Sequence, residues 1–310
     1  PRIDEIRFEE EKRRVLREVA DYKSAPDHKD RILIGREFYG ADSPHIYQTL
    51  GKENIIENAT TTNLRELHKR GYSPNNMDLI LVGDLPKNIG ALIENKFGDK
   101  LIGPGERYKF PRNLPLKNKL ILHNYALDLL NGDTPLSSSA SLTLGIFAPP
   151  IVDSDAYAVS MMTYTLSKKL FEVVSQRRGL AYSIGAKYDG SNNQGIIQIN
   201  GDIHSIKAEE SIECIFEEMK KMRNEIMDLK DLKEMEKKAV YGFAKDLESN
   251  AGHVVAIQEK LDYGVTPEIH LEKIRSVKPE DIREVAIKYL PENREDGKYV
   301  LLLRDPLKKE

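Results

Sequence analysis

The chain has 310 residues, of which 40% are hydrophobic and 31% are charged. This composition predicts a folded protein with one large or two ordinary domains. Its 47 basic and 50 acidic residues give a formal net charge of −3, so it lacks the excess positive charge that nucleic-acid-binding proteins use against phosphates.

The sequence also argues against a membrane or disulfide-stabilised protein. No apolar run approaches the roughly 20 residues that a membrane-spanning helix needs. The N-terminal residues are too charged for a signal peptide. The single cysteine, Cys214, excludes a disulfide framework and a thiolate metal cluster. We therefore expect a cytoplasmic protein with no nucleic-acid or membrane partner.

The first hundred residues predict several helices and one strand. Apolar residues recur at Phe8, Val15, Val19 and Tyr22, which predicts an amphipathic helix over residues 4–23. Apolar spacing together with threonine and glycine end signals predicts further helices over 27–40, 60–72 and 87–99. The segment 41–59 is interpreted as loop and turn, and the apolar run within 76–85 predicts a buried strand.

A segment rich in proline and glycine separates this part of the chain from the next. Residues 101–118 contain Pro104, Pro111 and Pro115, and we place an interdomain linker at 103–117. Beyond it, the sequence predicts strands over 119–125, 140–148, 179–188 and 195–203, and helices over 154–176, 207–222 and 227–248. The chain then ends in two helices and a strand over 298–306.

The two parts of the chain repeat one order of features. Residues 38–86 and 262–307 both run from a Tyr-Gly pair through a loop and a short helix to Tyr and Pro, an apolar strand and Asp. Such a repeat indicates two copies of one domain. Because only 38 residues precede Tyr39, we expect the first copy to be truncated at its start.

Five segments of the chain resemble one family in the same order. They are RFEEEKRRVLREV, YGADSP, GYSPNNMDLILVGD, LFEVVSQRRGLAYSIGA and VKPEDIREVAIKYL. The chain is thereby identified as similar to the pitrilysin/insulinase family of zinc peptidases, the inverzincins, which includes the mitochondrial processing peptidase. The resemblance implies an α+β fold with two homologous domains, each a sheet with helices packed on one side, and a peptide-binding chamber between them. We assign the second half of the first domain to 1–102 and a complete second domain to 118–310.

The resemblance also implies two acidic site residues. The family binds zinc through H-x-x-E-H on one helix and a further Glu on a later helix. Glu18 matches that Glu as a metal ligand, and Glu11 matches a second carboxylate that supports catalysis by orienting a ligand. Seven residues are close to two helical turns, so both carboxylates point to one side of the helix. The alternative is that both acids pair with Lys12, Arg14 or Arg17 on a solvated helix.

The histidines of that metal site are missing from the sequence. No H-x-x-E-H or H-x-x-H occurs, and the seven histidines have no helical partner three or four residues away. We therefore expect a zinc cofactor that receives one ligand from this chain, the rest coming from a partner chain or an N-terminal segment that bears H-x-x-E-H.

A tyrosine in the second domain completes the expected site. In the resembling proteins, a Tyr and an Arg seven residues earlier help to stabilise negative charge on the attacked carbonyl. Tyr182 matches the catalytic Tyr, but Ser175 stands where the Arg is expected. Arg177 and Arg178 are the candidate substrate-binding residues in its place.

Two functional hypotheses remain open at this stage. In the first, the chain is the C-terminal subunit or fragment of a zinc metalloendopeptidase, active on peptides only in a complex. In the second, it is a non-catalytic subunit of the same family that binds substrate or scaffolds an assembly, which Ser175 favours.

Overall fold

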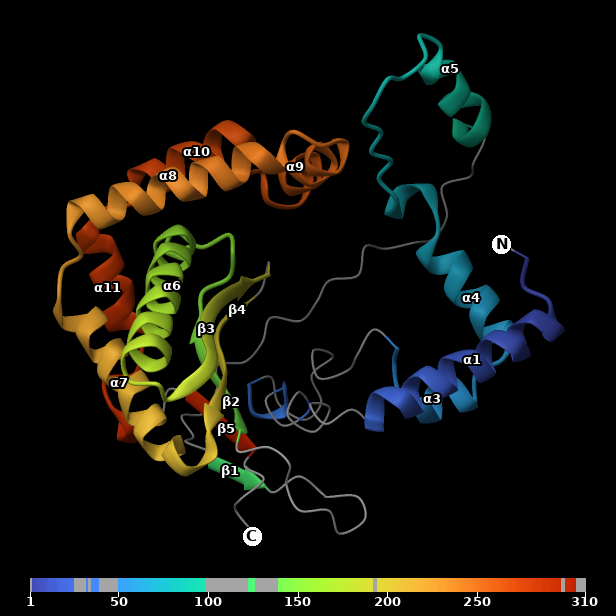
Figure 1. Ribbon diagram of the computed structural model, residues 1–310. Helices are drawn as coiled ribbons and strands as arrows, with labels where there is room; N and C mark the ends of the chain where they lie inside the picture. Colours follow the sequence, from blue (N-terminus) through green and yellow to red (C-terminus); the bar gives the residue numbers. More distant parts are fainter. Residues whose placement is uncertain are drawn as a thin grey trace. The chain divides into compact units, whose positions relative to one another are not determined.

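The computed structural model describes residues 2–24, 32, 35–38, 50–98, 122–125, 139–191, 194–296 and 299–304 (Figure 1). They belong to two compact units, which are described separately. The first unit takes in residues 1–28, 47–111 and 242–267, and the second takes in 29–46, 112–241 and 268–310. The predicted linker at 103–117 lies outside the described residues, so the position of the domain boundary stays a prediction.

The second unit is built on a five-stranded sheet. Its strands are β1 Leu122–Tyr125, β2 Ser139–Ala148, β3 Ala181–Gly190, β4 Gly195–His204 and β5 Tyr299–Arg304. They lie in the order β1-β5-β2-β4-β3, with β1 parallel to β5 and the other neighbours antiparallel. Strands at these places were predicted, and the α+β fold class is confirmed.

Helices pack against one face of this sheet. They are α6 Ala156–Leu170, which continues as a π-helix over Phe171–Arg177, α7 Ala208–Asn224 and α11 Pro279–Tyr289 (Figure 1). Helices α8 Leu229–Asp246 and α10 Pro267–Ser276 and two short 3₁₀ turns, Ser205–Lys207 and Arg294–Asp296, complete the unit. The arrangement of helices on one side of a sheet is the one that the family resemblance implied.

The core of the second unit forms because the inner strands alternate. On β4, Ile197, Ile199 and Ile203 are fully buried on the side of the helices, where they join Met162 and Leu166 of α6. Fully burying an aliphatic side chain of this size contributes roughly 1.5–3 kcal/mol. The sheet is therefore packed firmly against α6. Because the chain runs from α6 through the π-helix into β3, this packing also positions the start of β3.

At Gly195, at the start of β4, there is no room for a side chain. A Cβ atom there would lie 2.0 Å from the backbone oxygen of Pro149 and 2.8 Å from the ring of Tyr188. We expect Gly195→Ala to lower the free energy of unfolding by about 1–3 kcal/mol, the usual cost of overpacking.

A control is Gly242→Ala in α8, where nothing lies within 4 Å and the free energy of unfolding should rise by about 0.5–1 kcal/mol. Urea denaturation of both variants checks this, and equal stabilities would contradict it.

The first unit is mainly helical. It contains α1 Glu5–Ser24, α3 Glu53–Glu57, α4 Thr61–Gly71, a 3₁₀ turn over Pro74–Asn76, α5 Ile89–Ile93 with a π-helical continuation over Glu94–Gly98, and α9 Asn250–Tyr263. Helices α1, α4 and α5 were predicted, and Thr60 caps α4 through reciprocal hydrogen bonds with Asn63. Of the helix predicted over 27–40, residues 35–38 are described and are helical, and they belong to the second unit. No helix in the described ranges is long and apolar enough to cross a membrane.

Two local predictions for the helices were wrong. Helix α3 lies in the segment that we interpreted as loop and turn, and three helices instead of two follow residue 248. The additional helix, α9, carries its own signals: Ser249 accepts a hydrogen bond from the backbone N–H of Gly252, and Gly264 ends the helix in the left-handed conformation with φ 71°. These are an N-cap and a C-cap of ordinary type.

The predicted buried strand within 76–85 is also wrong. Residues 77–82 belong to no strand in the described part of the chain, and they are not buried. The exposed fractions of Met77, Leu79 and Leu81 are 52%, 55% and 40%. An apolar run becomes a buried strand only when a neighbouring strand pairs with its backbone and another layer covers its side chains. The run therefore leaves three apolar side chains exposed to solvent.

Candidate metal and substrate site

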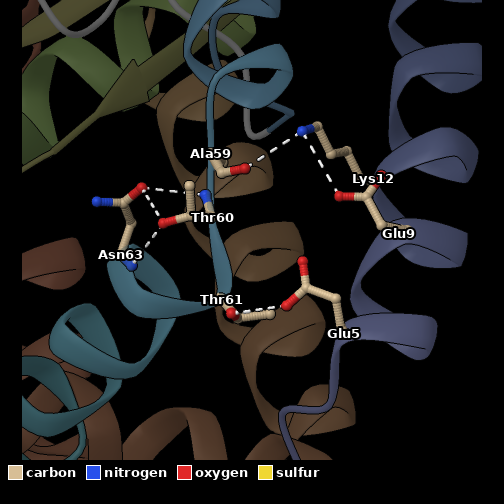
Figure 2. A network of polar contacts seen from close by, with 7 residues as sticks. All are labelled: Glu5, Glu9, Lys12, Ala59, Thr60, Thr61 and Asn63. Carbon is tan, nitrogen blue, oxygen red and sulfur yellow. Dashed lines mark hydrogen bonds and ion pairs between the residues drawn. The ribbon is translucent and has the colours of Figure 1, made fainter.

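Helix α1 is held against the start of α4 by polar contacts (Figure 2). The Lys12 ammonium donates a hydrogen bond to the carbonyl oxygen of Ala59 at 3.2 Å, and the Thr61 hydroxyl donates to the Glu5 carboxylate at 3.0 Å. The guanidinium of Arg65 also donates to the carbonyl oxygen of Ile3 at 2.7 Å. These contacts fix one side of α1 and therefore fix the direction in which its other side chains point.

Glu11 and Glu18 lie on another side of α1 and share one cation. Their side chains are 63% and 43% exposed, and Arg14 lies between them. The Arg14 Nε atom donates to Glu11 at 2.8 Å, and its Nη1 atom is ion-paired with Glu18. The hydrogen bond with Glu11 is the main cause that raises the pKa of Arg14. The ion-paired alternative is therefore the arrangement in the structure, and Arg14 is the partner.

The chemistry of these residues fits a contribution to a zinc site and does not fit a complete one. The described part of the chain contains no group of three or more His, Cys, Asp or Glu residues that could hold a metal ion. The paired carboxylates already accommodate a cation, the Arg14 guanidinium, so the Glu18 carboxylate fits the role of a single oxygen ligand.

Three of the histidines whose side chains are described, all except His253 on α9, lie beside tyrosine side chains. His68 stacks on Tyr72, His204 lies against Tyr182, and the His270 Nδ1 atom lies 3.1 Å from the Tyr157 hydroxyl. Burial lowers the pKa of His270. His28 and His45, and the side chain of His123, lie outside the described residues.

The backbone of β3 is irregular at Tyr182, and this irregularity sets the direction of the tyrosine. Ala181 pairs with Ile203 and Ser183 pairs with Asp202, so Tyr182 is an extra residue in β3, as in a β-bulge. A bulge of this kind redirects a side chain. The Tyr182 side chain is 60% exposed, and its ring centroid lies 4.5 Å from that of His204. The phenol is therefore accessible and is held on one side by the imidazole.

The other candidates lie just before Tyr182. Ser175 is in the π-helical turn Phe171–Arg177, and Gly179 has φ 58°, the left-handed conformation that favours glycine. Arg177 is exposed, and the Arg178 guanidinium donates to the Glu217 carboxylate on α7 at 3.0 Å. Arg178 is thus held toward α7, while Arg177 stays open to solvent. The structure places Tyr182 and both arginines in the second unit and Glu11 and Glu18 in the first.

Sequence reasoning missed three features of the site. The bulge at Tyr182 and the contact with His204 left no pattern in the sequence that we could use. The role of Arg14 had a signal, because its spacings of three and four residues from the two glutamates are those of helical ion pairs. We named Arg14 only as one of three possible partners.

Comparison with known proteins decides the family. The chain matches the model of the "Peptidase M16 inactive domain" over residues 58–238, which is more than half of its length. The chain belongs to this peptidase M16 family. The predicted membership of the pitrilysin-type zinc peptidases is thereby confirmed.

Curated relatives of this M16 chain are longer proteins. It is 22% identical over 251 residues to the uncharacterized zinc protease YmxG of Bacillus subtilis, a match that covers 80% of this chain and 58% of YmxG. It is 25% identical over 202 residues to the uncharacterized zinc protease ML0855 of Mycobacterium leprae, covering 64% and 43%. The chain spans about half the length of the curated relatives that it matches.

Solved M16-like structures share the fold. The peptidase M16 inactive domain from Pseudomonas fluorescens superposes with a TM-score of 0.81 at 18% identity, covering 99% of this chain and 72% of that one. A protease from Helicobacter pylori gives a TM-score of 0.79 at 16% identity, covering 98% and 73%. At these identities the likeness shows the fold alone.

Proposed function

We propose that this chain is the C-terminal part of a zinc metalloendopeptidase whose H-x-x-E-H segment is supplied by a partner polypeptide or a preceding segment. The observation that carries the proposal is the presentation of Glu11 and Glu18 together, accessible and already paired with a cation, on a helix fixed against α4. A family whose members are named zinc proteases supports the choice of metal.

In this proposal each residue has a distinct task. Glu18 supplies a carboxylate oxygen to the metal, and Glu11 orients the groups around it. A bound zinc ion would polarise the scissile carbonyl and lower the pKa of a water molecule. Tyr182 donates a hydrogen bond to the carbonyl oxygen as negative charge develops there. Arg177 and Arg178 bind the peptide substrate as cations.

The place where the missing segment binds is the apolar run 77–82 of the first unit. Met77, Leu79 and Leu81 alternate along a stretch that belongs to no strand in the described part of the chain. We assign this place to a β-strand of the polypeptide that carries H-x-x-E-H, because such a strand could pair with the backbone here and cover the apolar side chains. Its backbone would pair with the backbone of residues 79–82, and its own apolar layer would cover the leucines.

Introducing positive charge into this apolar surface tests the proposed assembly. We expect the double variant Leu79→Lys, Leu81→Lys to weaken association with the H-x-x-E-H polypeptide at least about tenfold, since burying two ammonium groups in an apolar interface is costly. The matched control is Leu229→Lys, because Leu229 is 64% exposed on α8. Light scattering and titration calorimetry would measure the association. Equal affinities for wild type, double variant and control would contradict binding at residues 77–82.

Where the H-x-x-E-H segment belongs to a partner polypeptide, the proposal makes this chain a split subunit of a heteromer. We also propose a cytoplasmic location. Cys214 is the single cysteine, and it is free and buried. A chain without an intrachain disulfide suits a reducing compartment.

A second candidate is a non-catalytic subunit that binds substrate. Ser175 in place of a fixed positive group, together with a family description as an inactive domain, favours it. A complex that contains an H-x-x-E-H polypeptide, binds peptides and remains free of zinc would support this second function.

A further inference from the structure

Arg14 occupies the position between the two proposed site carboxylates. We propose that Arg14 is a placeholder cation: it holds Glu11 and Glu18 together before the metal arrives, and zinc displaces it from Glu18. The inference rests on the proposed function and adds to it a positioning residue that the family resemblance did not supply.

The spacing of the three residues along α1 allows one guanidinium to reach both carboxylates. Arg14 follows Glu11 by three positions and precedes Glu18 by four, so all three side chains lie on one side of α1. The guanidinium uses two separate nitrogen atoms, Nε for Glu11 and Nη1 for Glu18. A planar group with several donors can bridge two carboxylates in this way, whereas a single ammonium group is a point charge.

The other cations near this side of α1 are used differently. Lys12 reaches the carbonyl of Ala59, and Arg7 pairs with Asp4 at the start of the helix. The exposed Arg13 and Arg17 lie one residue before and three residues after Arg14, which places them roughly 100° and 60° away around a helix axis. Arg14 is therefore the cation whose charge lies directly between the two carboxylates.

Zinc and the Arg14 guanidinium would compete for the Glu18 carboxylate. The two cations would also repel each other, because the guanidinium has charge +1 and the zinc ion has charge +2. Arg14 must therefore give up Glu18 when the metal binds. Its Nε contact with Glu11 is independent of that exchange, so Arg14 can still hold Glu11 in place.

The placeholder predicts a gain in metal affinity when Arg14 is neutralised. In the assembled complex we expect Arg14→Gln to bind zinc about three- to tenfold more tightly than wild type at low ionic strength. The difference should shrink as salt screens the charges. Arg13→Gln is the control, because it removes the same charge from the same helix at an angle that points away. Zinc affinity is measured by competition with a chromophoric chelator, without any use of peptidase activity.

A second readout uses the full chain without metal. Losing Arg14 leaves two like charges on one side of α1, so Arg14→Gln should lower Tm more at low salt than at high salt, and Arg13→Gln should not. Zinc affinity in Arg14→Gln equal to that in Arg13→Gln, with a zinc-loaded wild-type complex, would overturn the placeholder and leave the proposed function standing. A wild-type complex that binds no zinc would overturn both.

Discussion

Glu18→Gln is expected to strip zinc from the assembled complex while leaving the complex intact. The amide keeps the shape of the side chain but removes the negative charge of the ligand, and a catalytic zinc site has only three protein ligands. We expect wild-type complex to hold about one zinc ion and to cleave a long peptide in a reaction that chelators abolish. In Glu18→Gln both the zinc and the cleavage should be lost.

Three comparisons make this expectation specific. Glu11→Gln should weaken zinc binding less, by about ten- to a hundredfold, because Glu11 is proposed to act on a ligand rather than on the metal. Glu10→Gln, an exposed change on the same helix, should have no effect. The 310-residue chain alone should be free of zinc and inactive. Unchanged zinc content in the Glu18→Gln complex would reduce α1 to a structural role and favour the substrate-binding subunit.

Tyr182→Phe is expected to lower kcat of the complex by about a hundredfold, with little change in KM. Removing one donor to a developing oxyanion commonly costs about 10²–10³ in kcat. The phenyl ring keeps its contact with His204, so the fold of β3 should be unaffected. Tyr241→Phe is the control, because Tyr241 is 71% exposed on α8. Steady-state kinetics on a long peptide would measure the effect.

The neighbouring Ser175 provides a change in the opposite direction. Ser175→Arg should raise kcat, because it places a cation at the position that the family resemblance assigns to a second donor. If Tyr182→Phe and Ser175→Arg both leave kcat and KM unchanged, the second unit supplies no donor and the role of Tyr182 is wrong.

The fold was predictable where a local pattern and its packing agree. The alternating residues of β4 and the spacing of Phe8, Val15 and Val19 on α1 each match one geometry, and the structure has both. The run 77–82 has an equally strong strand pattern, yet it is exposed. Apolar periodicity gives a segment its preferred conformation, but burial depends on neighbours that are distant in the sequence.

The site was predictable to a different extent. The resemblance selected Glu18, Glu11 and Tyr182 by their order in the chain, and these assignments stay predictions. The sequence showed that Glu18 and Glu11 share one side of a helix. It did not show which of several nearby cations lies between them, because exposed lysine and arginine side chains have many accessible rotamers. It also did not show the bulge at Tyr182, which depends on how β3 pairs with β4.

The first unit is assembled from separate segments of the chain, and this affects the order in which the protein can fold during synthesis. That unit includes α9, which lies in residues 242–267, together with helices from the first hundred residues. A ribosome must therefore make residues 112–241 of the second unit before the first unit has all its parts. Domains usually fold in the order in which they emerge. Here the N-terminal helices are made well before residues 242–267, which complete their unit. Until those residues emerge, the exposed leucines of the N-terminal helices would be accessible to chaperones.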